Sequence, residues 1–244
     1  MKATIPGETQ PGATDHTPKA LNPLKASAAV AAIVLAAASC TTESPAPAAS
    51  NSCEHAPAST EAKLVSQLLG TDEYKTGYRD DSGLSEKLTD ELRQWKPGGT
   101  EYTTDVCRFS PKVPRTSGGN TLRVEFYWTS RSNPSKWGRT SGSYYNFNGI
   151  TGESDETLGK LRVPCSLPGE LNGLSKQTLL GADVSNTAYE GPEVNQQARD
   201  QQILFLYLMT RKATEALGCE NNPLKADPIV KAYTTPEKAA QAGS

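Results

Sequence analysis

The stretch TLRVEFYW, residues 121 to 128, alternates apolar and polar side chains more clearly than any other part of the chain. Successive side chains of a β-strand point to opposite faces, so this order predicts a strand with one buried face. The members of that face are Leu122, Val124, Phe126 and Trp128. Residues 102–109 are a second strand candidate, and the turn-rich segment between the two predicts an antiparallel hairpin.

Apolar residues recur at helical spacing on both sides of this hairpin. They predict helices over 59–70, 84–95 and 193–217, with Gly70, Lys96-Pro97-Gly98-Gly99 and Gly218 as stop signals. Further strands are expected near 144–150, 161–165 and 229–234, with a short helix over 174–180. This order predicts an α+β fold in which an antiparallel sheet packs against helices.

Four cysteines remain when Cys40 is set aside: Cys53, Cys107, Cys165 and Cys219. An even number predicts two disulfides if the chain is exported, as the uncharged stretch before Cys40 indicates. Four cysteines allow three connectivities. The first two cysteines and the last two are each 54 positions apart, and this spacing recurs with a period of 112.

A second match supports an internal repeat. The pattern that begins Leu68-Leu69-Gly70 returns, 111 positions later, as Leu179-Leu180-Gly181. We therefore expect a tandem duplication of two related halves, 53–158 and 159–235, followed by a flexible tail over 236–244. Duplication favours pairing within each half, Cys53 with Cys107 and Cys165 with Cys219.

The N-terminal region contains the longest uncharged stretch, ASAAVAAIVLAAASC, over residues 26–40. It follows Lys19 and Lys25 and is shorter than the roughly 20 residues of a membrane-spanning helix, so it predicts an export signal. Its end, Ala38-Ser39-Cys40, resembles the lipobox of bacterial lipoproteins. That resemblance implies a signal peptide over 1–39 and a diacylglycerol on Cys40. An uncleaved signal anchor and a freely secreted protein are the alternatives.

Residues 40–52 are small, polar and rich in Pro and Ala, as expected of a tether between membrane and domain. The lipobox, this tether, the cysteine before the helix that ends Leu-Leu-Gly and the strand around Cys107 together resemble envelope lipoproteins of actinobacteria such as Streptomyces. The resemblance implies a disulfide-bonded domain of unknown function on the outer face of the cytoplasmic membrane. It implies no catalytic residues.

Charge and residue types argue against several classes of function. Residues 40–244 hold 22 basic and 25 acidic side chains, a net charge of −3, so a nucleic-acid partner is not expected. His55 is the one histidine of that region, which leaves no serine or cysteine triad of the ordinary type. The cysteine spacing matches no zinc motif. We therefore expect no metal, no cofactor and no enzyme activity.

Binding is the favoured class, and segment 131–151 is its candidate surface because it combines aromatic and basic side chains and lacks acidic ones. Its members are Arg131, Lys136, Trp137, Arg139, Tyr144, Tyr145 and Phe147. The alternative is that these aromatics cover the sheet. The chain is thus expected to be a ligand- or partner-binding or sensing module of the envelope, with an envelope protein, a wall polymer or a small apolar molecule as partner. An accessory subunit or regulator of a membrane complex, and a hydrolase without a recognised motif, stay open.

Overall fold

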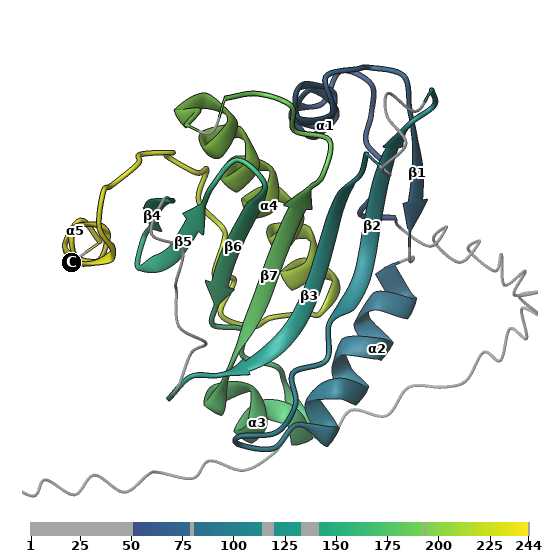
Figure 1. Cartoon of the computed structure of the whole chain (residues 1–244). Coiled ribbons are helices and arrows are strands. Elements are labelled where there is room, and N and C mark those ends of the chain that lie inside the picture. The colour runs from purple at the N-terminus through teal and green to yellow at the C-terminus, as the bar shows by residue number, and fades with distance from the viewer. Residues whose placement is uncertain (1–50, 79–80, 114–119, 133–141, 193, 244) are drawn as a thin grey trace, which may run out of the picture. The chain divides into compact units, whose positions relative to one another are not determined.

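The structure, a computed structural model, describes residues 51–78, 81–113, 120–132, 142–192 and 194–243. The predicted signal peptide over 1–39, Cys40 and nearly all of the predicted tether lie outside these residues. Within them, a seven-stranded antiparallel sheet packs against helices, which confirms the predicted α+β class (Figure 1). None of the described helices is long and apolar enough to span a membrane.

The elements follow the chain in an order that mixes helices and strands. They are α1 (Thr60–Leu69), β1 (Tyr74–Tyr78), α2 (Asp81–Gln94), β2 (Thr104–Pro111), β3 (Leu122–Ser130), β4 (Ser143–Phe147), β5 (Ile150–Ser154), β6 (Leu158–Val163), α3 (Asn172–Gln177), β7 (Thr178–Asn186), α4 (Gln196–Ala216) and α5 (Pro236–Gln241). The sheet order is β1-β2-β3-β7-β6-β5-β4. Strand β7, late in the sequence, therefore lies at the centre of the sheet.

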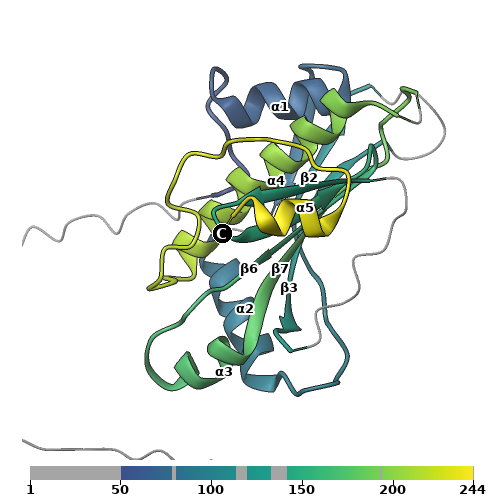
Figure 2. The same cartoon turned by 90° about the vertical axis from the view of Figure 1, so that its left-hand side faces the viewer.

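Strand β3 is the strand that the alternating sequence predicts. It pairs with β2 on one side, as the expected hairpin, and with β7 on the other. Leu122, Val124 and Phe126 are buried, because α1, α2 and α4 cover this face of the sheet (Figure 2). One continuous hydrophobic core fills the space between the sheet and these helices.

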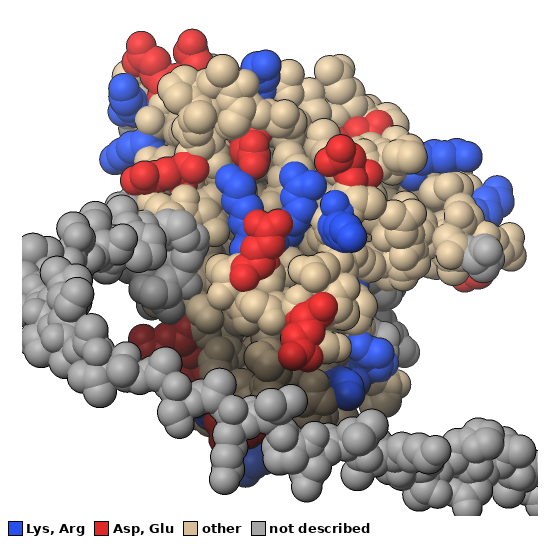
Figure 3. Space-filling model, turned by 180° about the vertical axis from the view of Figure 1, so that it is seen from behind, with Lys and Arg blue, Asp and Glu red and all other residues tan. Residues whose placement is uncertain are grey.

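The opposite face of the sheet carries charged side chains. Arg162 forms an ion pair with Asp183 at 3.4 Å, and its guanidinium lies 4.8 Å from the centre of the Tyr127 ring. Gly181 is required here, since a Cβ atom would lie 2.6 Å from that ring. On the side of the helices, the acidic and basic side chains of the described residues are interspersed (Figure 3).

Several helix ends follow the capping rules. The Ser59 hydroxyl accepts a hydrogen bond from the Ala62 N–H at the start of α1, and Gly70 ends that helix in the left-handed conformation, with φ of 66°. The third expected helix is shorter than predicted. It begins at Gln196, not at residue 193, because the Asn195 side chain caps the Ala198 N–H.

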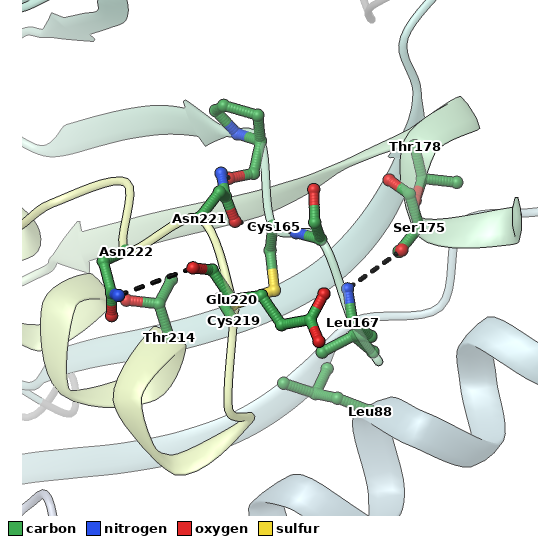
Figure 4. Close-up of a disulfide and its surroundings, with 12 residues drawn as sticks. Leu88, Cys165, Leu167, Ser175, Thr178, Thr214, Cys219, Glu220, Asn221 and Asn222 are labelled. Carbon is green, nitrogen blue, oxygen red and sulfur yellow. Dashed lines mark hydrogen bonds between the residues drawn. A yellow bond between two sulfur atoms is a disulfide. The ribbon is translucent and has the colours of Figure 1, made fainter. Parts of the chain in front are cut away.

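Both disulfides pair as the spacing predicts, Cys53 with Cys107 and Cys165 with Cys219. The second bond joins the segment after β6 to the segment after α4 (Figure 4). Asn221 reinforces it: its side chain accepts from the Ser166 N–H at 2.8 Å and donates to the Pro164 carbonyl at 2.7 Å. The cross-link therefore lies within a hydrogen-bonded junction.

The structure does not show a tandem duplication. The expected boundary between the halves, at 158/159, falls inside β6, and both halves contribute strands to one sheet. The two Leu-Leu-Gly segments also differ in conformation, because residues 68–70 end a helix whereas residues 179–181 lie in β7. The short helix expected over 174–180 is accordingly wrong beyond Gln177.

The C-terminal segment covers one edge of the sheet. Tyr233 forms a β-bridge with Tyr144 of β4, with N···O distances of 3.0 and 2.8 Å. A strand is expected over 229–234, but the structure has only this bridge there. Helix α5 follows and packs on β4, so the region predicted as a flexible tail contains a capped helix.

Candidate ligand-binding site

A pocket of about 510 Å³ lies where the C-terminal half of α2 meets the loop that enters β2. This volume is in the range of small-molecule sites, roughly 300–1,000 Å³. The lining residues are Lys87, Glu91, Gln94, Trp95, Lys96, Gly99, Thr100, Tyr102, Thr103 and Trp128. Aromatic, charged and amide side chains thus meet in one concave place.

Helix α2 supplies one wall because of its residue spacing. Leu84, Leu88 and Leu92 recur every four residues and are fully buried against the core. Lys87 and Glu91 follow the same spacing on the neighbouring stripe, and Trp95 continues it just after the helix end. One stripe of α2 therefore anchors the helix, and the next one lines the pocket.

The loop between α2 and β2 supplies the second wall and is held on both sides. Gly99 N–H donates to the Lys96 carbonyl at 3.0 Å and closes a turn. At the far end, the Thr129 hydroxyl of β3 donates to the Glu101 carboxylate. Directly after Glu101, Tyr102 is 68% exposed. The loop thus presents an aromatic side chain from a fixed backbone.

Trp128 contributes to the pocket from β3. It is only 2% exposed, and its indole N–H donates to the Leu88 carbonyl at 2.8 Å. This bond satisfies the single polar group of the ring and fixes its orientation. Sheet, helix and loop therefore meet at the pocket.

Glu91 is the buried polar group of the site, with a side chain 10% exposed. Its Oε1 accepts from the Thr104 hydroxyl at 2.6 Å and lies 3.5 Å from Lys87 Nζ. Its Oε2 is buried and has no hydrogen-bond partner among the residues that the structure describes. Glu91 therefore places a mostly buried negative charge in the wall of the pocket.

Two residues of the binding surface predicted from segment 131–151 are buried instead. Tyr145 is 0% exposed and Phe147 5%, because both face the helix layer from β4. Tyr145 donates its hydroxyl hydrogen to Asp200 of α4 at 2.8 Å, and burial raises the pKa of its phenol. These two aromatics belong to the core, so that part of the prediction is wrong.

Among the described residues, the other members of the predicted surface do not lie together in one site. Tyr144 is half-buried on the other side of β4, and Arg131 is exposed just after β3. Three members lie outside the described residues: Lys136, Trp137 and Arg139.

A pair of acidic side chains, Glu153 and Asp155, lines a second cavity of only about 10 Å³. Asp155 Oδ1 accepts from Thr157 and from the Leu158 N–H at 2.8 to 2.9 Å, which holds the turn between β5 and β6. Burial raises the pKa of Glu153, although Lys160 opposes this shift. A cavity of this size holds about one water molecule, so the pair has no cleft for a substrate.

The same turn carries a buried ion pair with α4. Glu156 and Arg199 have side chains 9% and 7% exposed, and Arg199 Nε donates to Glu156 Oε1 at 2.7 Å. The Asn195 N–H donates to the same oxygen at 2.8 Å. Arg199 Nη1 also donates to the Ser143 hydroxyl at 3.4 Å. This cluster joins β4, the β5–β6 turn and α4.

His55 lies in a different environment, between Phe109 and Phe205, with ring-centre distances of 5.7 and 6.3 Å. Burial lowers its pKa from 6.5 to about 4, and the positive charge of Lys212 acts in the same direction. Lys212 in turn forms an ion pair with Glu61 at 3.1 Å. His55 is thus a packed, neutral side chain at neutral pH.

The described residues contain no group of three or more His, Cys, Asp or Glu side chains that could hold a metal ion. No family model, no curated protein and no solved structure matches the chain.

The pocket was missed by sequence reasoning, although part of its signal is present. Lys87, Glu91 and Trp95 are spaced four residues apart beside a leucine stripe. The approach of Tyr102 and Trp128 to this stripe depends on long-range packing. The α2–β2 pocket and its binding residues are thus the candidate functional site of the domain.

Proposed function

We propose that the protein is an exported lipoprotein whose folded domain is a ligand-binding module, with the α2–β2 pocket as its site. The observation that carries the proposal is the pocket of about 510 Å³, in which a nine-tenths buried Glu91 side chain lies among Trp95, Tyr102 and Trp128. Aromatic walls with a few convergent polar groups are typical of small-molecule sites.

The location of this module follows from the N-terminal sequence. Cleavage before Cys40 and a diacylglycerol on that cysteine would hold the domain at the outer face of the cytoplasmic membrane. The Pro/Ala-rich residues after Cys40 would let the domain extend away from the membrane surface. Two acyl chains give firm anchoring, whereas one chain binds only marginally.

Mass spectrometry of protein extracted from its native envelope tests the location. We expect a mature chain that begins with a diacylglycerol-modified Cys40. An unmodified Cys40 behind an intact N-terminus would show that the anchoring proposal is wrong.

Tryptophan fluorescence tests the binding function, since two of the three tryptophans line the pocket. Small-molecule fractions of an envelope extract are titrated into the mature protein in detergent. We expect at least one fraction to change the emission of the wild type, and we expect Glu91→Gln, which keeps both pocket tryptophans, to need a higher concentration of that fraction for the same change. An equal response of the wild type and Glu91→Gln, or no response at all, contradicts the pocket as ligand site.

A further inference from the structure

The polar groups of the α2–β2 pocket are mixed in chemistry. Lys87 and Lys96 donate, Glu91 accepts, and Gln94, Thr100 and Thr103 can do both. Lys87 already lies 3.5 Å from Glu91, so the two charges offset each other. A site for a small anion would lack the carboxylate, and a site for a small cation would lack the lysines.

The aromatic groups of the pocket offer flat apolar surfaces beside these polar groups. Tyr102 is 68% exposed, and it is the only aromatic among the large exposed apolar side chains of the described residues. Trp95 is half-buried, with part of its ring available at the pocket. Tyr and Trp combine a rigid apolar face with a polar group and lose little entropy on binding.

The pocket wall is also held in place before any ligand binds. Thr104 is bonded to Glu91, Thr129 to Glu101, and Trp128 to the Leu88 carbonyl. A site fixed in this way loses less conformational freedom on binding. This matters most for ligands whose individual contacts are weak.

We infer that the ligand is a saccharide, bound as a short chain of pyranose rings. Each ring has hydroxyl groups that both donate and accept, as the mixed polar lining requires, and C–H faces that pack on Tyr102 and Trp95. The Glu91 side chain, 10% exposed in the pocket lining, supplies the negatively charged acceptor for these hydroxyls. This inference rests on the proposed ligand-binding function of the pocket and names its ligand class.

Isothermal titration calorimetry on the mature protein in detergent tests the ligand class. The saccharide probes are a glucose tetrasaccharide and an N-acetylglucosamine tetrasaccharide. Choline, inorganic phosphate and octanol represent a cation, an anion and an apolar ligand. We expect binding of at least one saccharide and none of the other probes.

Variants of the pocket assign the binding to its residues. Glu91→Gln and Trp95→Ala are each expected to weaken saccharide binding by about tenfold or more, through a lost charged acceptor and a lost ring face. Glu86→Gln removes the same charge from an exposed position of α2 outside the pocket and should bind like the wild type. Trp95→Phe keeps a ring face and should retain part of the affinity, and denaturation midpoints show that each variant is folded.

The outcomes separate the two proposals. If choline, phosphate or octanol binds in place of the saccharides and Trp95→Ala abolishes that binding, the pocket is a ligand site but the saccharide inference is wrong. If a saccharide binds equally well to Glu91→Gln and Trp95→Ala, the inference is wrong because the site lies elsewhere. If no probe binds and envelope fractions also fail to change the fluorescence, both proposals fall.

Discussion

Glu91 and Glu156 are buried to the same extent, with side chains 10% and 9% exposed, but they have different partners. Glu156 is paired with the buried guanidinium of Arg199 at 2.7 Å, and the preceding residue, Asp155, lines a cavity of about 10 Å³. Glu91 is bonded to a hydroxyl and to the half-exposed Lys87, beside a pocket of about 510 Å³. Burial alone therefore does not separate a structural carboxylate from a binding one. The partners and the adjoining space do.

The largest effect is expected at the closed ion pair. Glu156→Gln leaves the buried Arg199 charge without its counter-charge, so we expect a loss of about 3–5 kcal/mol in the free energy of unfolding. Urea denaturation measures this loss. The matched control is Glu170→Gln, which removes an acid from an exposed pair with Arg93 and should leave the midpoint nearly unchanged. Equal losses in the two variants would contradict the structural role of Glu156.

A loss of comparable size is expected when either disulfide is removed. Each bond closes a span of 54 residues, and in the chain-entropy model such a bond contributes about 4 kcal/mol. Cys165→Ala with Cys219→Ala should lose about this amount and keep the native junction, because Asn221 still bonds to the Ser166 N–H and the Pro164 carbonyl. Adding Asn221→Ala to this variant should lower the urea midpoint further. No additional loss would show that the junction depends on the disulfide alone.

An intermediate effect is expected from pH, through His55. Its folded-state pKa of about 4 lies below the ordinary 6.5, so the unfolded chain takes up a proton more readily as the pH falls. Stability should therefore decrease between about pH 6.5 and pH 4, with full stability above that window. Urea midpoints at pH 7 and pH 5 check this. His55→Phe, which keeps a ring between Phe109 and Phe205, should flatten the dependence, and an unchanged slope would contradict the assignment.

The smallest effect on stability is expected at the pocket. Glu91→Gln keeps an oxygen that accepts from Thr104 and loses only the attraction to a half-exposed lysine, so the change should stay within about 1 kcal/mol. Urea denaturation of Glu91→Gln beside Glu156→Gln gives a direct comparison. If Glu91→Gln lowered the free energy of unfolding as much as Glu156→Gln, both carboxylates would be structural.

Some of the fold could be predicted because its signals are local. The alternation over 121–128 reports which side of β3 is buried, and Ser59 and Gly70 mark the ends of α1 by the bonds they make with nearby backbone. The turn between β4 and β5 carries another local signal. Asn148-Gly149 joins β4 to β5 with φ of 54° and 88°, and this dipeptide favours a tight hairpin turn.

Strand β7 shows where local reasoning failed. The match of Leu179-Leu180-Gly181 with Leu68-Leu69-Gly70 favoured a helix, whereas packing between β3 and β6 made the segment a strand. A few side chains do not set the conformation of a segment when cross-strand pairing with distant residues contributes more. Gly181 illustrates this, since it ends no helix and instead makes room for the Tyr127 ring.

The sequence by itself determined the periodicities, the caps of α1 and the even number of cysteines in the described residues, because these depend on residues close in the chain or on a simple count. Only the tertiary structure decided the central place of β7, the burial of Tyr145 and Phe147, and the meeting of Glu91, Tyr102 and Trp128 at one pocket. The reason is physical. These contacts join segments far apart in the chain, and they form only when the combined burial of the whole core offsets the entropy of closing the loops between them.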